Sequence, residues 1–222
     1  MERLYKRVYV WEFPVRMTHW LNVLSIVTLA ITGYYIGNPF ITAYRDGQFI
    51  MGWMRFIHFS AAYIFTVSIA VRVYWAFAGN PYATWRAFFP FTPEDSARMV
   101  QQIMFYSFLS DKPRFVVGHN PLAGFYYLLM FAMFLVEILT GFALFSLPNP
   151  GGFLNTILGW EFSVFSVQTV RWIHHLTMWI LIYFVMLHIY ISIYLDRVEK
   201  SGIVGSIFTG YKSVHEDVKV KG

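Results

Sequence analysis

The feature that most limits how this chain can fold is a set of four apolar runs, each at least 20 residues long. A helix needs about 20 mainly apolar residues to cross the hydrocarbon core of a bilayer. Of the 222 residues, 57% are hydrophobic and only 13% are charged, whereas an average soluble domain is about a quarter charged. We therefore expect an all-α integral membrane protein, a bundle of four transmembrane helices at residues 17–36, 56–78, 121–147 and 172–194.

The gaps between these runs are short. The longest, residues 79–120, spans 42 positions and leaves no room for a separate soluble domain. We therefore expect residues 1–222 to form a single transmembrane domain.

The positive charges predict how the helices are oriented. Cytoplasmic loops of membrane proteins carry an excess of Lys and Arg. Both termini and the second loop together hold thirteen such residues, and the other side holds three, namely Arg45, Arg55 and Arg171. This distribution predicts cytoplasmic N- and C-termini and a cytoplasmic second loop, and it explains the net charge of +5 without a nucleic-acid partner.

The second loop contains a helix start. Thr92-Pro93-Glu94-Asp95 has an N-cap residue, a proline at the first helical position and acids in the first turn. An apolar stripe follows, opposite Arg98, Gln101 and Gln102, and it consists of Met99, Val100, Ile103, Met104 and Phe108. This pattern predicts a short helix in the cytoplasmic interface. The outer loop, residues 148–170, is apolar and nearly uncharged, which suits either a partner surface or packing on the membrane.

Four histidines in the spans sort into two pairs. His174 and His188 are fourteen residues apart in one run, so they share a helix face about 21 Å apart along the axis. The topology places His58 at the outer depth, with His174, and His19 at the inner depth, with His188. Histidine inside a membrane is costly and marks a candidate functional site.

Paired imidazoles on separate helices suit a haem with two axial histidines in an apolar slot. Zinc or copper would need three or four donors at each level, and the absence of cysteine excludes thiolate sites. A proton relay would need acids near the histidines, and Glu137 is the only acid well inside a span. The remaining alternative is that the histidines only pack at helix interfaces. We expect two b haems, an outer one held by His58 and His174 and an inner one held by His19 and His188.

Two residues fit the surroundings of these haems. Gly33 lies fourteen positions after His19, where a missing side chain would let a porphyrin approach the outer end of the helix, although close helix packing would also explain it. Arg72 lies fourteen positions after His58, where it could pair with a haem propionate. The alternative for Arg72 is that it extends to the cytoplasmic interface.

Three other histidines are weaker candidates. His175 is the rival of His174 as iron ligand and otherwise faces a partner, lipid or a haem propionate. His215 lies in the charged C-terminal segment, where solvation explains it. His119, with Asn120, could hydrogen-bond a quinone carbonyl at the cytoplasmic end of the third span, although Asn120 before Pro121 also suits a helix cap.

Several segments carry a resemblance to a known family across nearly the whole chain. They include Pro14-Val15-Arg16-Met17-Thr18-His19-Trp20, Thr32-Gly33-Tyr34, Arg55-Phe56-Ile57-His58-Phe59, Arg72-Val73-Tyr74-Trp75-Ala76-Phe77-Ala78-Gly79-Asn80, Gly118-His119-Asn120-Pro121 and Thr140-Gly141-Phe142-Ala143-Leu144. The chain resembles the b-type cytochrome subunit of membrane-bound nickel–iron uptake hydrogenases. That four-helix plan is shared with formate dehydrogenase cytochrome b subunits, and the Tyr-Trp-Ala-Phe-x-Gly-Asn and Gly-His-Asn-Pro segments are similar to the hydrogenase branch.

The resemblance implies a membrane anchor that conducts electrons. A periplasmic hydrogenase, with a large subunit and a small subunit whose C-terminal helix packs on the cytochrome, would pass electrons from iron–sulfur clusters to the outer haem. The inner haem would then reduce quinone in the respiratory chain. His19, His58, His174 and His188 match the family's haem-ligand positions, and His119 and Asn120 match the neighbourhood of quinone reduction. A dimer of such complexes is left open.

Two other classes of function remain as alternatives. The first is a formate dehydrogenase cytochrome or a stand-alone di-haem oxidoreductase acting on quinone or superoxide. The second is a transporter or channel, which would require inverted repeats, broken helices or a polar span that we do not find in the sequence.

Overall fold

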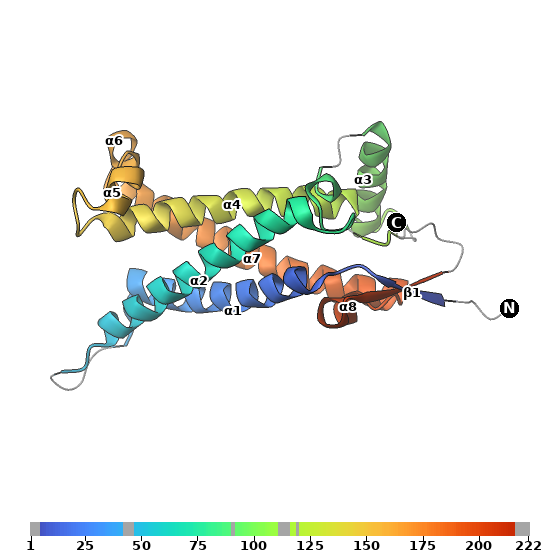
Figure 1. The fold of residues 1–222 in the computed structure, drawn as a ribbon, viewed down its shortest axis with the longest axis horizontal. Helices are drawn as coiled ribbons and strands as arrows, with labels where there is room; N and C mark the ends of the chain where they lie inside the picture. Colours follow the sequence, from blue (N-terminus) through green and yellow to red (C-terminus); the bar gives the residue numbers. More distant parts are fainter. Residues whose placement is uncertain (1–4, 42–46, 90–91, 111–115, 119, 216–222) are drawn as a thin grey trace. The chain divides into compact units, whose positions relative to one another are not determined.

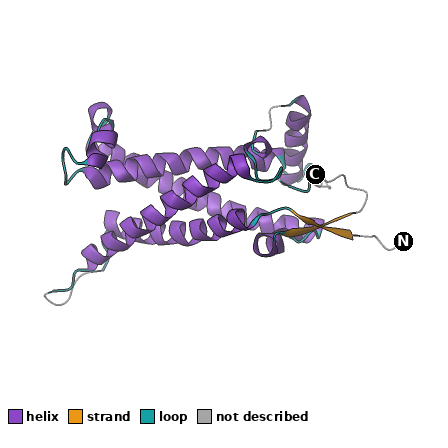
Figure 2. Cartoon of the chain, in the orientation of Figure 1, coloured by secondary structure: helices purple, strands orange, loops and turns teal. Residues whose placement is uncertain are grey.

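Four long helices dominate the computed structural model, which describes residues 5–41, 47–89, 92–110, 116–118 and 120–215. They are α1 (Phe13–Gly37), α2 (Ile50–Ala78), α4 (Pro121–Ser146) and α7 (Val167–Glu199), shown in Figures 1 and 2. Each contains a predicted span, except that α4 ends one residue earlier. The other three helices are longer than their predicted spans. The added residues flank the apolar runs, as Asp196 and Arg197 do in α7, and continue the helix beyond the length that the hydrocarbon core requires.

All four helices are long and apolar enough to cross a membrane. No more than 22% of the residues in the most apolar window of any of them are buried inside the protein. A helix that stays apolar on its outward face is a membrane span, because in water that face would require a second protein layer. The all-α membrane class is therefore confirmed.

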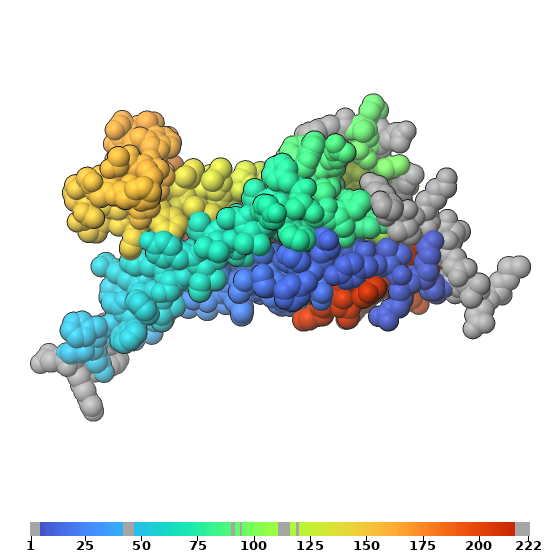
Figure 3. Space-filling model, viewed as in Figure 1, coloured from blue at the N-terminus to red at the C-terminus, as the bar shows by residue number. Residues whose placement is uncertain are grey.

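The remaining helices are short. They are the 3₁₀ turn η1 (Trp85–Ala87), α3 (Pro93–Tyr106), α5 (Phe153–Leu158), α6 (Glu161–Val164) and α8 (Ile203–Thr209). The residues of α5 and α6 lie at the surface, orange in Figure 3. Phe153 is 79% exposed and Val164 is 65% exposed, so this part of the outer loop presents apolar side chains outward.

The chain divides into two compact units. Unit 1 contains residues 1–20, 69–129 and 186–222, and unit 2 contains residues 21–68 and 130–185. Each of the four long helices contributes residues to both units.

A small sheet in unit 1 was not expected from the sequence. Strand β1 (Tyr5–Tyr9) pairs antiparallel with β2 (Tyr211–His215), in the register Tyr5 with His215 and Tyr9 with Tyr211. His215 is therefore a strand residue whose ring lies 4.5 Å from that of Tyr5, centroid to centroid, and not a freely solvated side chain. Sheets need partners distant in sequence, so a pattern read along one segment does not reveal them.

Unit 1 has its own apolar core, made by Val10, Trp11, Val15, Tyr82, Ala83, Val117 and Val214. Next to it, one Glu12 carboxylate oxygen accepts hydrogen bonds from the Trp75 indole and the Asn80 backbone N–H, both at 2.8 Å. Lys212 in β2 is buried, and burial lowers the pKa of its ammonium group, opposed by the carboxylates of Glu199 and Asp196. The two chain ends are thus tied together by apolar packing and by paired polar groups.

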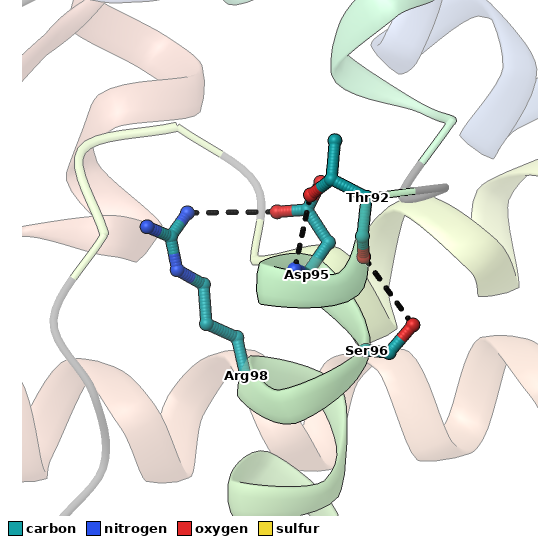
Figure 4. Close-up of polar contacts among 4 residues, drawn as sticks. All are labelled: Thr92, Asp95, Ser96 and Arg98. Carbon is teal, nitrogen blue, oxygen red and sulfur yellow. Dashed lines mark hydrogen bonds and ion pairs between the residues drawn. The ribbon is translucent and has the colours of Figure 1, made fainter.

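Helix α3 starts where the sequence predicts. The Thr92 hydroxyl oxygen accepts a hydrogen bond from the Asp95 backbone N–H at 3.1 Å, and the Asp95 carboxylate lies 3.5 Å from the Arg98 guanidinium (Figure 4). The predicted polar face is wrong at one position, because Gln102 is buried at 2% exposure. The apolar residues Val100, Ile103 and Met104 are exposed. Phe105 stacks on Tyr194, with 5.9 Å between the two ring centroids.

We expect Thr92→Ala to loosen the first turn of α3. An N-cap hydroxyl stabilises a helix by about 1 kcal/mol, which corresponds to roughly a fivefold change in the opening equilibrium. Amide hydrogen exchange at Asp95 and Ser96 should therefore become about fivefold faster, whereas Thr92→Ser should exchange like the native protein. Equal exchange in the Ala and Ser variants would contradict the capping role.

Candidate functional site

The histidines of unit 2 line a cavity of about 670 Å³. His58, His174 and His175 all contribute to its wall, together with Gly33, and every lining residue belongs to unit 2. The rest of the wall is mainly aliphatic and aromatic. The volume lies within the roughly 300–1,000 Å³ of typical cofactor and ligand sites. We name this region the outer site, after the predicted topology.

His58 is held by two consecutive residues of α1. Its Nδ1 lies 2.9 Å from the Thr32 hydroxyl oxygen. A Cβ atom placed on Gly33 would lie 3.1 Å from Cε1 of the same ring, which is tighter than ordinary van der Waals contact. The glycine predicted to admit a porphyrin therefore also makes room for the His58 imidazole.

His174 is held in the same way by two consecutive residues of α4. Its Nδ1 lies 2.9 Å from the Thr140 hydroxyl oxygen, and a Cβ atom on Gly141 would lie 3.0 Å from its Cε1. In addition, the Glu137 carboxylate lies 2.8 Å from Nδ1. Glu137, the only acid well inside a predicted span, is therefore a carboxylate partner of His174.

The two halves of the outer site repeat one pattern. A Thr-Gly pair near the end of one helix faces a histidine near the start of the next, and an arginine, Arg55 or Arg171, stands three residues before that histidine and lines the cavity. The sequence carried this signal as two Thr-Gly pairs and two Arg-x-Ile-His segments. The prediction used only the histidines and Gly33, and it missed Thr32, Thr140, Gly141, Glu137, Arg55 and Arg171.

His175 occupies a different position from its neighbour. A Cβ atom on Gly37 would lie 3.2 Å from its Cε1, and its ring lies 6.4 Å from that of Trp179. It lines the same cavity. Among the described residues, His58 and His174 each contact a Thr-Gly pair, whereas the contacts of His175 are with Gly37 and Trp179.

The inner site lies in unit 1 and brings together His19 and His188. Their ring centroids are 6.3 Å apart, and Tyr127 lies 6.4 Å from His188. Both imidazoles are half-buried, and Nδ1 of His19 has no hydrogen-bond partner within the described part of the chain. The structure thus brings these two histidines together, with 6.3 Å between their ring centroids.

Arg72 is also in unit 1 and is 8% exposed. Its Nη2 donates to the Ala83 carbonyl at 3.2 Å, and its guanidinium lies 5.1 Å from the Phe88 ring centroid. Among the described residues, Nη1 has no hydrogen-bond partner. The Arg72 side chain is thus buried against the loop that follows α2, with one donor group unused among the described residues.

A fourteen-residue spacing recurs in all four long helices. It relates His19 to Gly33 in α1, His58 to Arg72 in α2, Tyr127 to Gly141 in α4, and His174 to His188 in α7. Each pair has one member in unit 1 and one in unit 2. Sequence reasoning missed Tyr127, although counting fourteen residues back from Gly141 would have found it.

The quinone candidates are only partly described. His119 lies outside the described residues. Asn120 caps α4, because its side-chain oxygen accepts from the Ala123 backbone N–H at 2.7 Å. Tyr106 lies near its amide group. Burial raises the pKa of the Tyr106 phenol, partly offset by the amides of Gln102 and Asn120.

The donor chemistry of both sites is that of paired nitrogens. In the described part of the chain, no three His, Asp or Glu side chains gather in a way that could hold a bare metal ion. Two imidazoles beside an apolar cavity instead suit a metal that brings its own equatorial ligands.

Known proteins are similar to this chain over most of its length. The family model described as prokaryotic cytochrome b561 matches residues 10–210. A probable Ni/Fe-hydrogenase B-type cytochrome subunit of Rhizobium leguminosarum bv. viciae is 40% identical over 209 residues, covering 91% of this chain and 87% of that protein. The corresponding subunit of Cupriavidus necator is 39% identical over 216 residues, covering 94% of this chain and 88% of the relative. A probable Ni/Fe-hydrogenase 1 B-type cytochrome subunit of Escherichia coli strain K12 is 35% identical over 214 residues, with 92% and 90% covered.

We expect Gly33→Ala and Gly141→Ala to destabilise the protein. A Cβ atom at either position would press on an imidazole, and overpacking of this kind costs about 1–3 kcal/mol, more than the gain of up to about 1 kcal/mol in helix propensity. Gly52→Ala in α2 is the matched control, because its nearest contact, Phe49 Cβ, would be at an ordinary 3.6 Å. Thermal unfolding in detergent would check this. A melting temperature unchanged at both tested positions would contradict the close fit.

Proposed function

The chain belongs to the prokaryotic cytochrome b561 family and, within it, to the b-type cytochrome subunits of Ni/Fe-hydrogenases, and on that premise we propose that it is the membrane-anchoring electron-transfer subunit of a hydrogenase complex. Electrons from the iron–sulfur clusters of a periplasmic small subunit enter at the outer site and leave to the quinone pool from the inner site. The subunit does not itself react with hydrogen.

Haem b fits the outer site. The cavity has apolar walls, imidazoles from two different helices, and glycines at positions 33 and 141 where side chains would intrude. His58 and His174 are the proposed iron ligands, supported by their equivalent Thr-Gly environments. Arg55 and Arg171 line the cavity as cations for the carboxylates of the cofactor.

A second haem b is proposed at the inner site, with His19 and His188 as ligands. The contact between their rings supports the pairing. Within the part of the chain that the structure describes, Arg72 has an unused buried donor, and a buried cation needs an anionic partner, which a propionate would supply. Tyr127 lies beside both Arg72 and His188 and belongs to the same surroundings.

Bound haem supplies a one-electron carrier in each site. The residues of the chain bind it, set its orientation and exclude water. His58 and His174 at the outer site, and His19 and His188 at the inner site, would hold the metal, and the apolar wall would favour its state of lower net charge. His119 and Asn120 stay the proposed quinone contacts, with Tyr106 and Gln102 as polar neighbours of Asn120.

The exposed apolar side chains of α5 and α6 are the proposed contact for the hydrogenase small subunit and its C-terminal helix. The large subunit would be held through the small one. This assignment places the surface on the periplasmic side of a bacterial inner membrane, with both termini cytoplasmic. Residues 1–222 act as a single domain, since all four long helices contribute to both units.

The observation that carries this proposal is the pair of histidines at each site within a chain of this family. The relatives named above are hydrogenase subunits, which favours a hydrogenase over a formate dehydrogenase or a stand-alone oxidoreductase. Purification of the intact complex tests the partner directly. Nickel in stoichiometric amounts is expected, whereas molybdenum or tungsten would indicate the formate dehydrogenase alternative.

We expect His58→Ala and His174→Ala to remove the same haem. Each leaves the outer iron with one axial ligand, while the inner site keeps both. A pyridine haemochrome count on the purified complex should fall from two haems to one in either variant, with identical remaining spectra. His175→Ala is the matched control and should keep both haems. Loss of different haems in the two variants, or loss in the control, would show the pairing to be wrong.

We expect Arg72→Leu to lower the midpoint potential of the inner haem and to leave that of the outer haem nearly unchanged. A buried cation stabilises the reduced state, which carries one fewer positive charge, so its removal favours the oxidised state. Arg72→Lys keeps the charge and should shift the potential less. A redox titration in which the inner potential and haem content do not move in Arg72→Leu would exclude the propionate role.

A further inference from the structure

Two buried threonines of the outer site each make two hydrogen bonds through the side-chain hydroxyl, one to a backbone carbonyl and one to a histidine ring. The Thr32 hydroxyl lies 2.6 Å from the Thr28 carbonyl oxygen and 2.9 Å from His58 Nδ1. The Thr140 hydroxyl lies 2.6 Å from the Val136 carbonyl oxygen and 2.9 Å from His174 Nδ1. A carbonyl oxygen can only accept, so each hydroxyl donates its single hydrogen to the backbone.

The donor in the hydrogen bond between Thr32 and His58 can now be assigned. Since the Thr32 hydrogen is already donated, its oxygen must accept from Nδ1, which therefore carries a hydrogen. The Leu29 carbonyl, which also interacts with this ring, is likewise an acceptor. In a neutral imidazole with hydrogen on Nδ1, Nε2 keeps the lone pair.

The same direction follows at His174 on separate grounds. The Thr140 oxygen must accept for the reason that applies to Thr32. The Glu137 carboxylate, 2.8 Å from Nδ1, has only acceptor atoms when ionised. Both neighbours therefore place hydrogen on Nδ1 of His174 and leave Nε2 free.

We propose that Thr32 and Thr140 are positioning residues of the outer site, which fix His58 and His174 as the Nδ1–H tautomers whose Nε2 atoms can bind iron. This inference rests on the proposed function, because it takes these histidines as the haem ligands. Hydrogen bonds from a ligand imidazole to a neighbouring acceptor fix its tautomer and orientation and raise its basicity, and their loss typically lowers metal affinity by about 10–100-fold.

The adjacent glycines let this geometry form. Gly33 and Gly141 follow the threonines directly, and their missing side chains admit the ring edges that carry Cε1. A larger residue would push each imidazole away from its threonine. The two residues of each Thr-Gly pair thus act together. The threonine hydroxyl oxygen accepts the hydrogen on Nδ1, and the glycine leaves room for the imidazole ring.

The two halves differ in the second acceptor. His58 has the neutral carbonyl of Leu29, whereas His174 has the carboxylate of Glu137. A charged acceptor makes a hydrogen bond roughly twice as strong as a neutral one. Loss of the Thr32 hydroxyl should therefore perturb the haem more than loss of the Thr140 hydroxyl.

The test compares Thr32→Val and Thr140→Val in the purified complex. Valine keeps the shape of threonine and removes the hydroxyl. We expect a higher midpoint potential of the outer haem in both variants, because a less basic imidazole stabilises the oxidised iron less. We also expect about a 10–100-fold weaker hold on the outer haem in Thr32→Val, a smaller change in Thr140→Val, and a changed low-temperature paramagnetic resonance signal of the oxidised haem in both.

Thr32→Ser and Thr140→Ser restore the hydroxyl and should restore the native potential. Thr28→Val is the matched control on α1. The Thr28 hydroxyl donates to the Leu24 carbonyl at 2.8 Å, so its removal should leave the midpoint potential of the outer haem unchanged. Should Thr32→Val fail to accumulate, Thr140→Val with its serine variant carries the comparison, and an unmoved potential there overturns the inference.

Native potentials and spectra in both valine variants would overturn the positioning role. If His58→Ala and His174→Ala still lose one haem in that case, the proposed function stands alone. If those alanine variants keep both haems, the ligand assignment itself fails. A shift that the serine variants do not reverse would show a packing effect and would also overturn the inference.

Discussion

The constraint on which the outer site depends is the cost of an imidazole with an unsatisfied nitrogen in an apolar surrounding. A buried polar group without a hydrogen bond costs about 1–3 kcal/mol. A ligand histidine must offer one nitrogen to iron, so its other nitrogen needs a protein acceptor. Threonine in a membrane helix supplies that acceptor because its own hydrogen is spent on the backbone carbonyl four residues earlier. The outer site repeats this solution with Thr32 and Thr140.

The repetition relates α1 and α2 to α4 and α7. At the outer site the two pairs of helices contribute equivalent residues, so the site is nearly symmetric in composition. At the inner site they differ, because α1 supplies His19 where α4 supplies Tyr127, and α7 supplies His188 where α2 supplies Arg72. The same fourteen-residue spacing therefore builds one site with matched halves and one with unlike halves.

Much of the fold followed from the sequence because membrane helices obey strong local rules. The four spans, the start of α3 at Thr92 and the contact of His19 with His188 were all predictable from length, capping chemistry and helical period. The pairing of β1 with β2 was not, since it joins the two ends of the chain. The burial of Gln102 in α3 was not predictable either, because packing against other segments outweighed the pattern of polar residues in the sequence. The threonines escaped notice since a small polar residue in a span is common, and only the distance to a histidine shows its use.

The unlike halves of the inner site place polar chemistry where the proposed function needs it. Haem iron exchanges one electron, whereas a quinone takes up protons together with electrons, so the end that serves quinone requires charged and protonatable groups. Replacing one histidine position by Arg72 and another by Tyr127 supplies a buried cation and a phenol without adding a third imidazole that could compete for iron. The outer site has its own charged residues, Arg55, Arg171 and Glu137, at the cavity wall, and its matched threonines and glycines serve to hold the cofactor. The two helix pairs thus supply matched residues at one site and unlike residues at the other, which suits an electron entry site and an electron exit site in the proposed function.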